Sequence, residues 1–104
     1  MYIKKSLSFT TTAGGAASGP VRTLPRVARL LAVVVADAQF DDNYDLSITD
    51  VDNRTLYSHA AITTAVDEAP VGGVAVPVGK APWTVTIAGG GNAQTGTVTL
   101  LLEA

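Results

Sequence analysis

The sequence predicts an all-β protein, an antiparallel β-sandwich (immunoglobulin-like or jelly-roll-like) of about seven or eight strands with an extended N-terminal arm. Apolar and polar residues alternate in YDLSIT, WTVTI and TVTLLLE, a pattern typical of strands with one buried face. With 104 residues, 47% hydrophobic and 15% charged, the composition is that of one globular unit. We expect residues 1–23 to form a strand or arm followed by a flexible linker, and residues 24–104 to form the sandwich.

The first third of the chain carries two predicted strands separated by small residues. The first strand is marked by alternating residues, namely Ile3, Lys5, Leu7 and Phe9. The segment TTTAGGAASGP that follows is expected to be the flexible linker. After it, LPRVARLLAVVVADA is apolar at both parities from Leu30 to Val35, which fits a strand covered on both faces or a helix. Three successive valines and the preceding Pro25 favour the strand.

The middle of the chain predicts a hairpin. Tyr44, Leu46 and Ile48 share one face of YDLSIT, the Asp- and Asn-rich DVDNR favours a turn, and TLYSHA supplies the returning strand. The stretch from Ala60 to Lys80 is poorly patterned. It suggests one or two short strands bounded by prolines, around Val71, Val74, Val76 and Val78.

Two further strands flank a glycine run near the C-terminus. Trp83 alternates with Val85 and Ile87 and is predicted to lie in the core, where its burial stabilises the fold by about 4–6 kcal/mol before entropy is subtracted. A Walker-type phosphate loop needs Lys and then Ser or Thr after its last glycine, with a helix next, whereas here Thr97 and a strand follow. The glycines are therefore predicted to supply turn conformations with positive φ, at Gly89, Gly90, Gly91 and Gly96.

Composition argues against several classes of function. A net charge of -2 argues against general nucleic-acid binding, and the absence of cysteine excludes disulfides and thiolate metal sites. The longest apolar run, LLAVVVA, is too short to span a bilayer, and the N-terminal serines, threonines and glycines do not fit a secretory signal. We expect no nucleic-acid partner, no membrane partner and no cofactor.

Acidic residues around the predicted hairpin form a weak candidate for a calcium site. Asp41, Asn43 and Asp45 have the D-x-N-x-D spacing of a calcium loop, but Leu46 stands where an EF-hand needs glycine. The weak candidate ligands are Asp41, Asn43, Asp50 and Asp52. A turn-forming acidic rim is the favoured interpretation. Paired carboxylates for glycoside hydrolysis could come from the same residues, but nothing in the sequence sets their separation.

No nucleophile–base pair is evident. His59 is the one histidine, and Ser58 beside it points to the opposite face of a strand. We therefore predict no catalytic residue and no enzymatic activity. An alternative use of the aromatic residues is a sugar-stacking surface made by Trp83, Tyr57 and Tyr44, which would indicate a carbohydrate-binding module.

The distribution of charge points to a binding arm. Positive charge gathers in the first thirty residues, whereas eight of the nine acids fall between Asp37 and Glu68. We predict that the arm meets an acidic partner or a neighbouring copy. Leu101 lies opposite in face to its apolar neighbours and needs a cover, from another subunit or an exchanged first strand. The predicted partner-binding residues are Lys4, Lys5, Arg22 and Leu101.

The chain also resembles a group of small β-sandwich virion proteins of tailed bacteriophages. The resemblance covers Arg26 to Glu103 and rests on YDLSITDVDNRTLY and on VGKAPWTVTIAGGGNAQTGTVTLLLE. These correspond to a "YDVTITD-x-DG" hairpin and a "GPLTVTVSNAG…GTVTLYV" ending in that group. The sequence departs from the group at Asn53-Arg54 in the turn and at Trp83, and the N-terminal arm has no counterpart.

The resemblance implies a structural function without enzymatic residues. The expected function is that of a capsid decoration or cement protein, located at the capsid surface and bound to the lattice of the major capsid protein. Neighbouring copies would meet through the N-terminal arm, giving a homo-oligomer. A position at the head–tail junction or in the tail, and a carbohydrate-binding module, are the alternatives.

Overall fold

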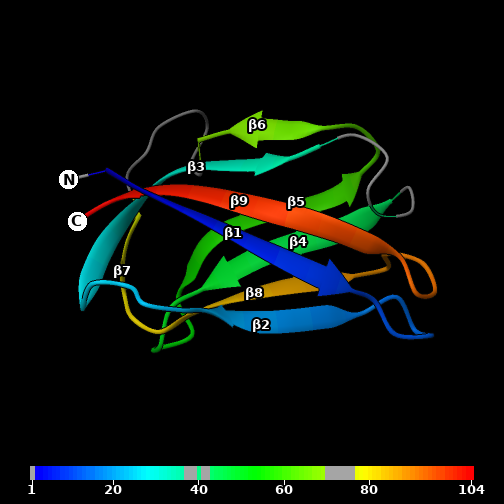
Figure 1. The fold of residues 1–104 in the computed structure, drawn as a ribbon, viewed down its shortest axis with the longest axis horizontal. Coiled ribbons are helices and arrows are strands. Elements are labelled where there is room, and N and C mark those ends of the chain that lie inside the picture. The colour runs from blue at the N-terminus through cyan, green and yellow to red at the C-terminus, as the bar shows by residue number, and fades with distance from the viewer. Residues whose placement is uncertain (1, 37–39, 41–42, 70–76) are drawn as a thin grey trace.

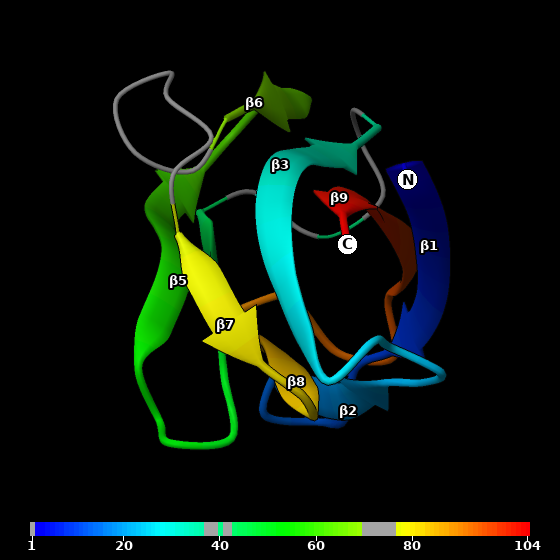
Figure 2. The same ribbon diagram turned by 90° about the vertical axis from the view of Figure 1, so that its left-hand side faces the viewer.

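The protein is a sandwich of two antiparallel sheets (Figure 1, Figure 2). The computed structural model describes residues 2–36, 40, 43–69 and 77–104, and these contain nine strands. The first sheet has the order β1–β9–β3–β6, with β7 also paired to β3, and its strands are β1 (Tyr2–Thr10), β3 (Val27–Val35), β6 (Val66–Glu68), β7 (Val78–Lys80) and β9 (Thr95–Glu103). The second has the order β2–β8–β4–β5, and its strands are β2 (Ala17–Val21), β4 (Tyr44–Thr49), β5 (Thr55–Ile62) and β8 (Trp83–Ala88). The predicted fold class is confirmed.

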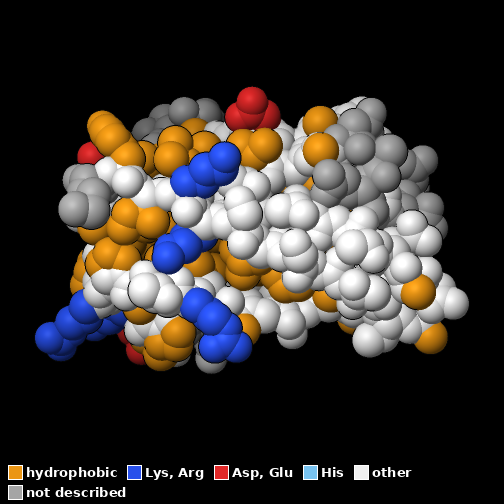
Figure 3. Space-filling view, viewed as in Figure 1, with side chains coloured by type: hydrophobic (Ala, Val, Ile, Leu, Met, Phe, Trp, Pro, Cys, Tyr) orange, Lys and Arg blue, Asp and Glu red, His pale blue; other side chains and the backbone are white. Residues whose placement is uncertain are grey.

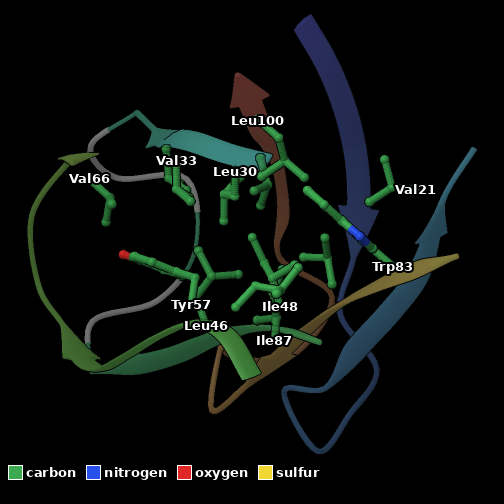
Figure 4. Packing of buried hydrophobic residues seen from close by; sticks show 14 of the residues in the cluster. Val21, Leu30, Val33, Leu46, Ile48, Tyr57, Val66, Trp83, Ile87 and Leu100 are labelled. Atoms are coloured by element: carbon green, nitrogen blue, oxygen red, sulfur yellow. The ribbon is translucent and has the colours of Figure 1, made fainter. Parts of the chain in front are cut away.

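The core lies between the two sheets and is built by the alternation seen in the sequence. Trp83, Val85 and Ile87 of β8 are fully buried, while the threonines between them are exposed. Leu30 and Leu100 reach the same layer from the opposite sheet (Figure 4). Each such side chain removed from water contributes roughly 1.5–3 kcal/mol before entropy is subtracted. The prediction that Trp83 belongs to the core is confirmed.

β3 is a strand, as the valine run favoured over a helix. It pairs with β9, β6 and β7, and its register with β9 shifts between Leu30 and Ala32. The bulge there explains why the segment is apolar at both parities, because the extra residue breaks the alternation of faces. Leu31 is consequently half-buried rather than enclosed.

Residues 1–23 do not stand apart from the sandwich, contrary to the expected division of the chain. β1 pairs with β9 from Tyr2 to Thr10, and β2, within the expected flexible linker, pairs with β8. β2 was not predicted because ASGPV consists of small residues and includes a proline, which an edge strand tolerates. The linker interpretation of residues 10–20 is therefore wrong for this structure.

The turn between β1 and β2 is held against the glycine run that follows β8. The N–H of Gly90 donates to the C=O of Gly15 at 2.8 Å, and the buried hydroxyl of Thr11 donates to the C=O of Gly91. A Cβ on Gly15 would lie 2.9 Å from the nitrogen of Gly90, so only glycine allows this approach. The glycine run is thus both a turn and a docking place for the first loop.

The glycine prediction holds in part. Gly89 and Gly91 have positive φ angles of 72° and 83° in the turn after β8. Gly96, in contrast, lies inside β9, opposite Phe9 of β1. There it is a buried residue of a paired strand and not part of a turn.

The predicted hairpin is confirmed as β4 and β5. Their ladder contains two irregularities, and Ala61 has a positive φ of 52° with its N–H bonded to Asp45. The poorly patterned stretch beyond it contains β6 and β7, and Val78 begins β7. The other predicted positions there, Val71, Val74 and Val76, lie outside the described residues. No helix long and apolar enough to cross a bilayer occurs in the described part of the chain.

Candidate partner-binding surface

The outer face of β1 and β9 is covered by uncharged hydroxyls over most of its length. Facing side chains form three pairs with oxygen–oxygen distances of 3.3 to 3.5 Å, namely Ser6–Thr99, Ser8–Thr97 and Thr10–Thr95. Such cross-strand hydroxyl pairs each contribute a few tenths of a kcal/mol, about 0.2–1 relative to alanine. This part of the face is a polar, regular surface without charge.

The other end of the same face carries charge and exposed apolar side chains. Lys4 lies opposite Leu101, and Arg29 pairs with Glu103 of β9 at 3.7 Å. Tyr2 is 72% exposed and Leu101 39% exposed. Figure 3 shows lysine, arginine and hydrophobic groups gathered at the end of the molecule where β1 begins, and few at the other end of that view. We call this area the basic–apolar patch, and its residues are Tyr2, Lys4, Val27, Arg29 and Leu101.

A cleft of about 440 Å³ runs between the edge strands β1 and β2. Leu7, Phe9 and Val21 give it apolar walls, and Lys5 and Arg22 bring two positive charges to it. The adjacent groove, of about 520 Å³, continues from Arg22 towards Pro82. Among the described residues, no acidic side chain lines either hollow. The cleft therefore favours a ligand that is apolar in part and negatively charged in part.

The four predicted partner-binding residues fall on two surfaces. Lys4 and Leu101 meet on the outer face, as cross-strand neighbours. Lys5 lies on the same strand as Lys4 but lines the cleft, where Arg22 joins it from the end of β2. The alternation of a strand separates the two neighbouring lysines, so they serve different contacts.

The candidate calcium ligands that the structure describes, Asn43, Asp50 and Asp52, do not assemble into a metal site. Asn43 precedes β4 and Asp50 follows it, so that the two lie a full strand apart, roughly 20 Å. Asp41 lies outside the described residues. The described residues contain no group of three His, Asp or Glu side chains that could hold a metal ion. Among them, then, the calcium interpretation has no site.

Asp50 instead builds the turn between β4 and β5. Its Oδ1 accepts the N–H of Asp52 at 3.0 Å and that of Arg54 at 2.9 Å. Burial alone would raise the pKa of the Asp50 carboxyl, but these N–H donors and the Arg54 charge outweigh it and hold the pKa below its usual value. The turn-forming interpretation is confirmed for Asp50.

A polar cluster that the sequence reasoning missed joins β5 to β6. The Tyr57 hydroxyl donates to Glu68 Oε1 at 2.6 Å, and His59 Nδ1 lies 2.9 Å from the same oxygen and 3.1 Å from the Tyr57 hydroxyl. Burial, together with the hydrogen bond and charge of Glu68, raises the pKa of the Tyr57 phenol well above its ordinary value. Tyr57 and His59 stand at i and i+2 of a strand, a spacing that signals a shared face. The sequence did not place Glu68 beside them, because the stretch that contains it, from Ala60 to Lys80, has no clear alternation.

The cluster is suited to holding two strands together rather than to chemistry. Ser58 pairs with Ser47 across the ladder and faces away from His59, as predicted. The hydroxyl that does reach His59 belongs to Tyr57, whose raised pKa makes it a poor nucleophile at neutral pH.

The proposed sugar-stacking surface is wrong. Trp83 is 0% exposed, Tyr57 2% and Tyr44 4%, so none of the three offers a ring face to a ligand. The alternation that places Trp83 inward also places it out of reach of sugars. The aromatic side chain that is exposed among these strands is Tyr2, in the basic–apolar patch.

Comparison with known proteins shows the fold. The sequence matches no protein-family model and no curated protein. Among solved structures, the chain is similar to a subunit of the disulfide-linked pili called Bacillus endospore appendages, with a TM-score of 0.57 and 13% identity over 98% of this chain and 84% of that one. It is also similar to a chain of the capsid asymmetric unit of cyanophage Pam1, with a TM-score of 0.56 and 23% identity over 98% and 81%. Both are parts of large assemblies, and at these identities the likeness concerns the fold.

Proposed function

We propose that this chain is a structural virion protein of a tailed bacteriophage, a capsid decoration or cement protein that binds the lattice of the major capsid protein. The observation that carries the proposal is the basic–apolar patch, which exposes Tyr2 and Leu101 beside Lys4 and Arg29 at the end of the β1–β9 face opposite the hydroxyl pairs. Exposed apolar groups surrounded by charge are typical of interaction surfaces. The sequence resemblance and the capsid chain of similar fold support the same conclusion.

The patch suits attachment to a repeating surface. Each copy brings a small area, so a single contact is weak, but copies that also touch one another reinforce it through raised local concentration. Behind the patch, the two sheets share one hydrophobic core, as a stable attachment body requires. A cement protein requires these two properties and no catalytic group.

Rebinding to particles tests the proposal. Capsids of the encoding phage, freed of this protein, should bind it again in co-sedimentation, and Leu101→Asp or Lys4→Glu should weaken binding by about tenfold or more. Thr86→Asp, on the exposed face of the opposite sheet, is the matched control and should bind normally. Electron microscopy of labelled protein on complete virions then locates it. Label at the head–tail junction or the tail would replace the decoration role with those alternatives, and absence from virions would refute the proposal.

A further inference from the structure

β1 has a free edge along its whole length within the described residues. It ends the order β1–β9–β3–β6, so one side pairs with β9 and the other with no strand of that sheet. Just past β1, the N–H of Thr11 donates to the C=O of Gln94 at 2.9 Å. In an antiparallel ladder, every second residue of a strand bonds to the partner strand. Since Thr11 bonds towards the β9 side, the odd-numbered residues of β1 do the same. The main-chain N–H and C=O groups of Lys4, Ser6 and Ser8 therefore point away from β9.

The hydroxyl pairs on the outer face agree with this assignment of the residues of β1 that bond to β9 and those that do not. Side chains approach more closely at the positions of a ladder that are not hydrogen-bonded to each other. Ser6 and Thr99, and likewise Ser8 and Thr97, bring their hydroxyls within 3.3 and 3.4 Å. A strand added beside β1 would therefore find a regular row of donors and acceptors at these serines.

Such a strand would also cover the cleft between β1 and β2. Every second side chain of the added strand would point inward, over Leu7 and Phe9 at one end and towards Lys5 and Arg22 at the other. Leu7 and Ile3 are only partly buried against the core, so an apolar side chain placed there removes further surface from water. A carboxylate at the cationic end would meet two positive charges and no acid.

We propose that the free edge of β1 accepts an extended acidic segment of a partner protein as an additional antiparallel strand, with apolar side chains over Leu7 and Phe9 and a carboxylate between Lys5 and Arg22. Main-chain bonds would supply affinity and the cleft would supply specificity, as in other cases of strand addition. The proposal rests on the proposed function only for the owner of the segment, which would then be the capsid lattice.

The lysines decide between acidic and other occupants. A lysine on an edge strand opposes pairing with neutral or basic strands, and this protects many proteins from aggregation. A second copy of this chain would bring another Lys4 and Lys5 to the same edge, so like charges would oppose it. An acidic strand reverses the sign of that interaction.

The experiment uses the full chain and synthetic peptides as long as β1, nine residues. The acidic probe is TVTVTDTVT, whose inward-facing Val, Val, Asp and Val lie opposite Phe9, Leu7, Lys5 and Ile3 in antiparallel register, and its control is TVTVTKTVT. NMR should show saturable binding of the acidic probe alone, with slowed amide exchange at Ser6 and Ser8. Lys5→Glu should weaken binding by about tenfold or more, whereas Lys4→Glu, on the other face of the same strand, should change it by less than about threefold.

A second variant tests the main-chain contribution. Ser6→Pro removes one edge N–H that β9 does not use, and it should abolish binding, while Ser6→Ala should keep it. Should the proline variant fail to fold, the amide protection in the unaltered chain still decides. Absence of saturable binding at millimolar peptide, equal binding of both peptides, or protection of Ser6 by self-association without peptide would each overturn the proposal.

The two proposals fail in different ways. A chain that protects Ser6 on adding the acidic peptide but ignores capsids keeps the strand-addition site and loses the virion role. A chain that binds capsids unchanged after both Lys5→Glu and Ser6→Pro keeps the virion role and loses this site.

Discussion

The two lateral sides of the sandwich, where edge strands of the two sheets meet, differ in how they are closed. On one side, where β5 and β6 lie (Figure 2), Tyr57 and His59 of β5 bond to Glu68 of β6, so that a polar cluster spans the gap between the sheets. On the other side β1 and β2 leave a cleft of about 440 Å³ lined by Lys5 and Arg22. On the first side the polar side chains bond to one another across the gap, and on the second side the described residues that line the cleft include two cations and no acid. The difference indicates that the first side maintains the fold and the second is available to a partner.

The largest loss of stability is expected in the loop between β1 and β2, on the side of the sandwich that has the cleft, which we call the open side. Gly15→Ala would place a Cβ 2.9 Å from the backbone nitrogen of Gly90 at a φ of 79°, and should lower the free energy of unfolding by about 2–4 kcal/mol. Urea denaturation followed by circular dichroism measures it. Gly14→Ala is the matched control, since nothing lies within 4 Å of its Cβ, and should cost less than about 1 kcal/mol. Equal effects of the two substitutions would contradict the docking of the first loop.

The other side, which Tyr57, His59 and Glu68 join and which we call the closed side, should lose stability when one hydroxyl is removed. Tyr57→Phe removes the 2.6 Å bond to Glu68 and should lower the free energy of unfolding by about 1–2 kcal/mol. Tyr2→Phe, at an exposed site on the open side, should leave it unchanged in the same denaturation assay. A Tyr57→Phe protein as stable as the parent would show that the cluster does not hold β5 to β6.

Alkaline pH should loosen the closed side through the same residue. The pKa of Tyr57 is raised in the folded state, so its contribution is fully present below the ordinary tyrosine pKa of about 10 and is lost as the pH rises above it. Unfolding free energies at neutral and at alkaline pH should therefore differ more for the parent than for Tyr57→Phe. Identical pH profiles would mean that the phenol does not titrate differently on folding.

The smallest effect on stability is expected at the cationic residues of the open side. Lys5→Glu and Lys4→Glu should each change the free energy of unfolding by less than about 0.5 kcal/mol, because neither lysine has an ion-pair partner among the described residues. Thermal melts check this. A large loss of stability would show that the lysines support the fold and would weaken their assignment to a partner.

Much of the fold was predictable, and the misses share one cause. Strands with a strict alternation, such as the one containing Trp83, were predicted because burial of one face leaves a period of two in the sequence. β2 was missed because Ala17–Val21 is small and lies at an edge, where pairing depends on main-chain bonds that leave no pattern. The prediction of a separate N-terminal arm treated the same stretch as a flexible linker, so it failed for the same reason.

The candidate site was predictable only as a set of residues. The charge count directed attention to Lys4, Lys5 and Arg22, but the division of the lysines between two surfaces required the register of β1 with β9. The aromatic alternative failed for the reason that made Trp83 a good core prediction. The Tyr57–His59–Glu68 cluster required the pairing of a three-residue strand, which short-range pattern does not indicate.

The hydroxyl pairs on the outer face of β1 and β9 have a consequence for how the protein responds to salt concentration. Serine and threonine hydroxyls carry no net charge, so dissolved ions hardly alter their attraction for water, whereas contacts made by lysine and arginine weaken as ionic strength rises. If the cationic residues bind an acidic segment as proposed, raising salt would weaken that contact and leave the hydration of the Ser and Thr side chains of β1 and β9 nearly unchanged.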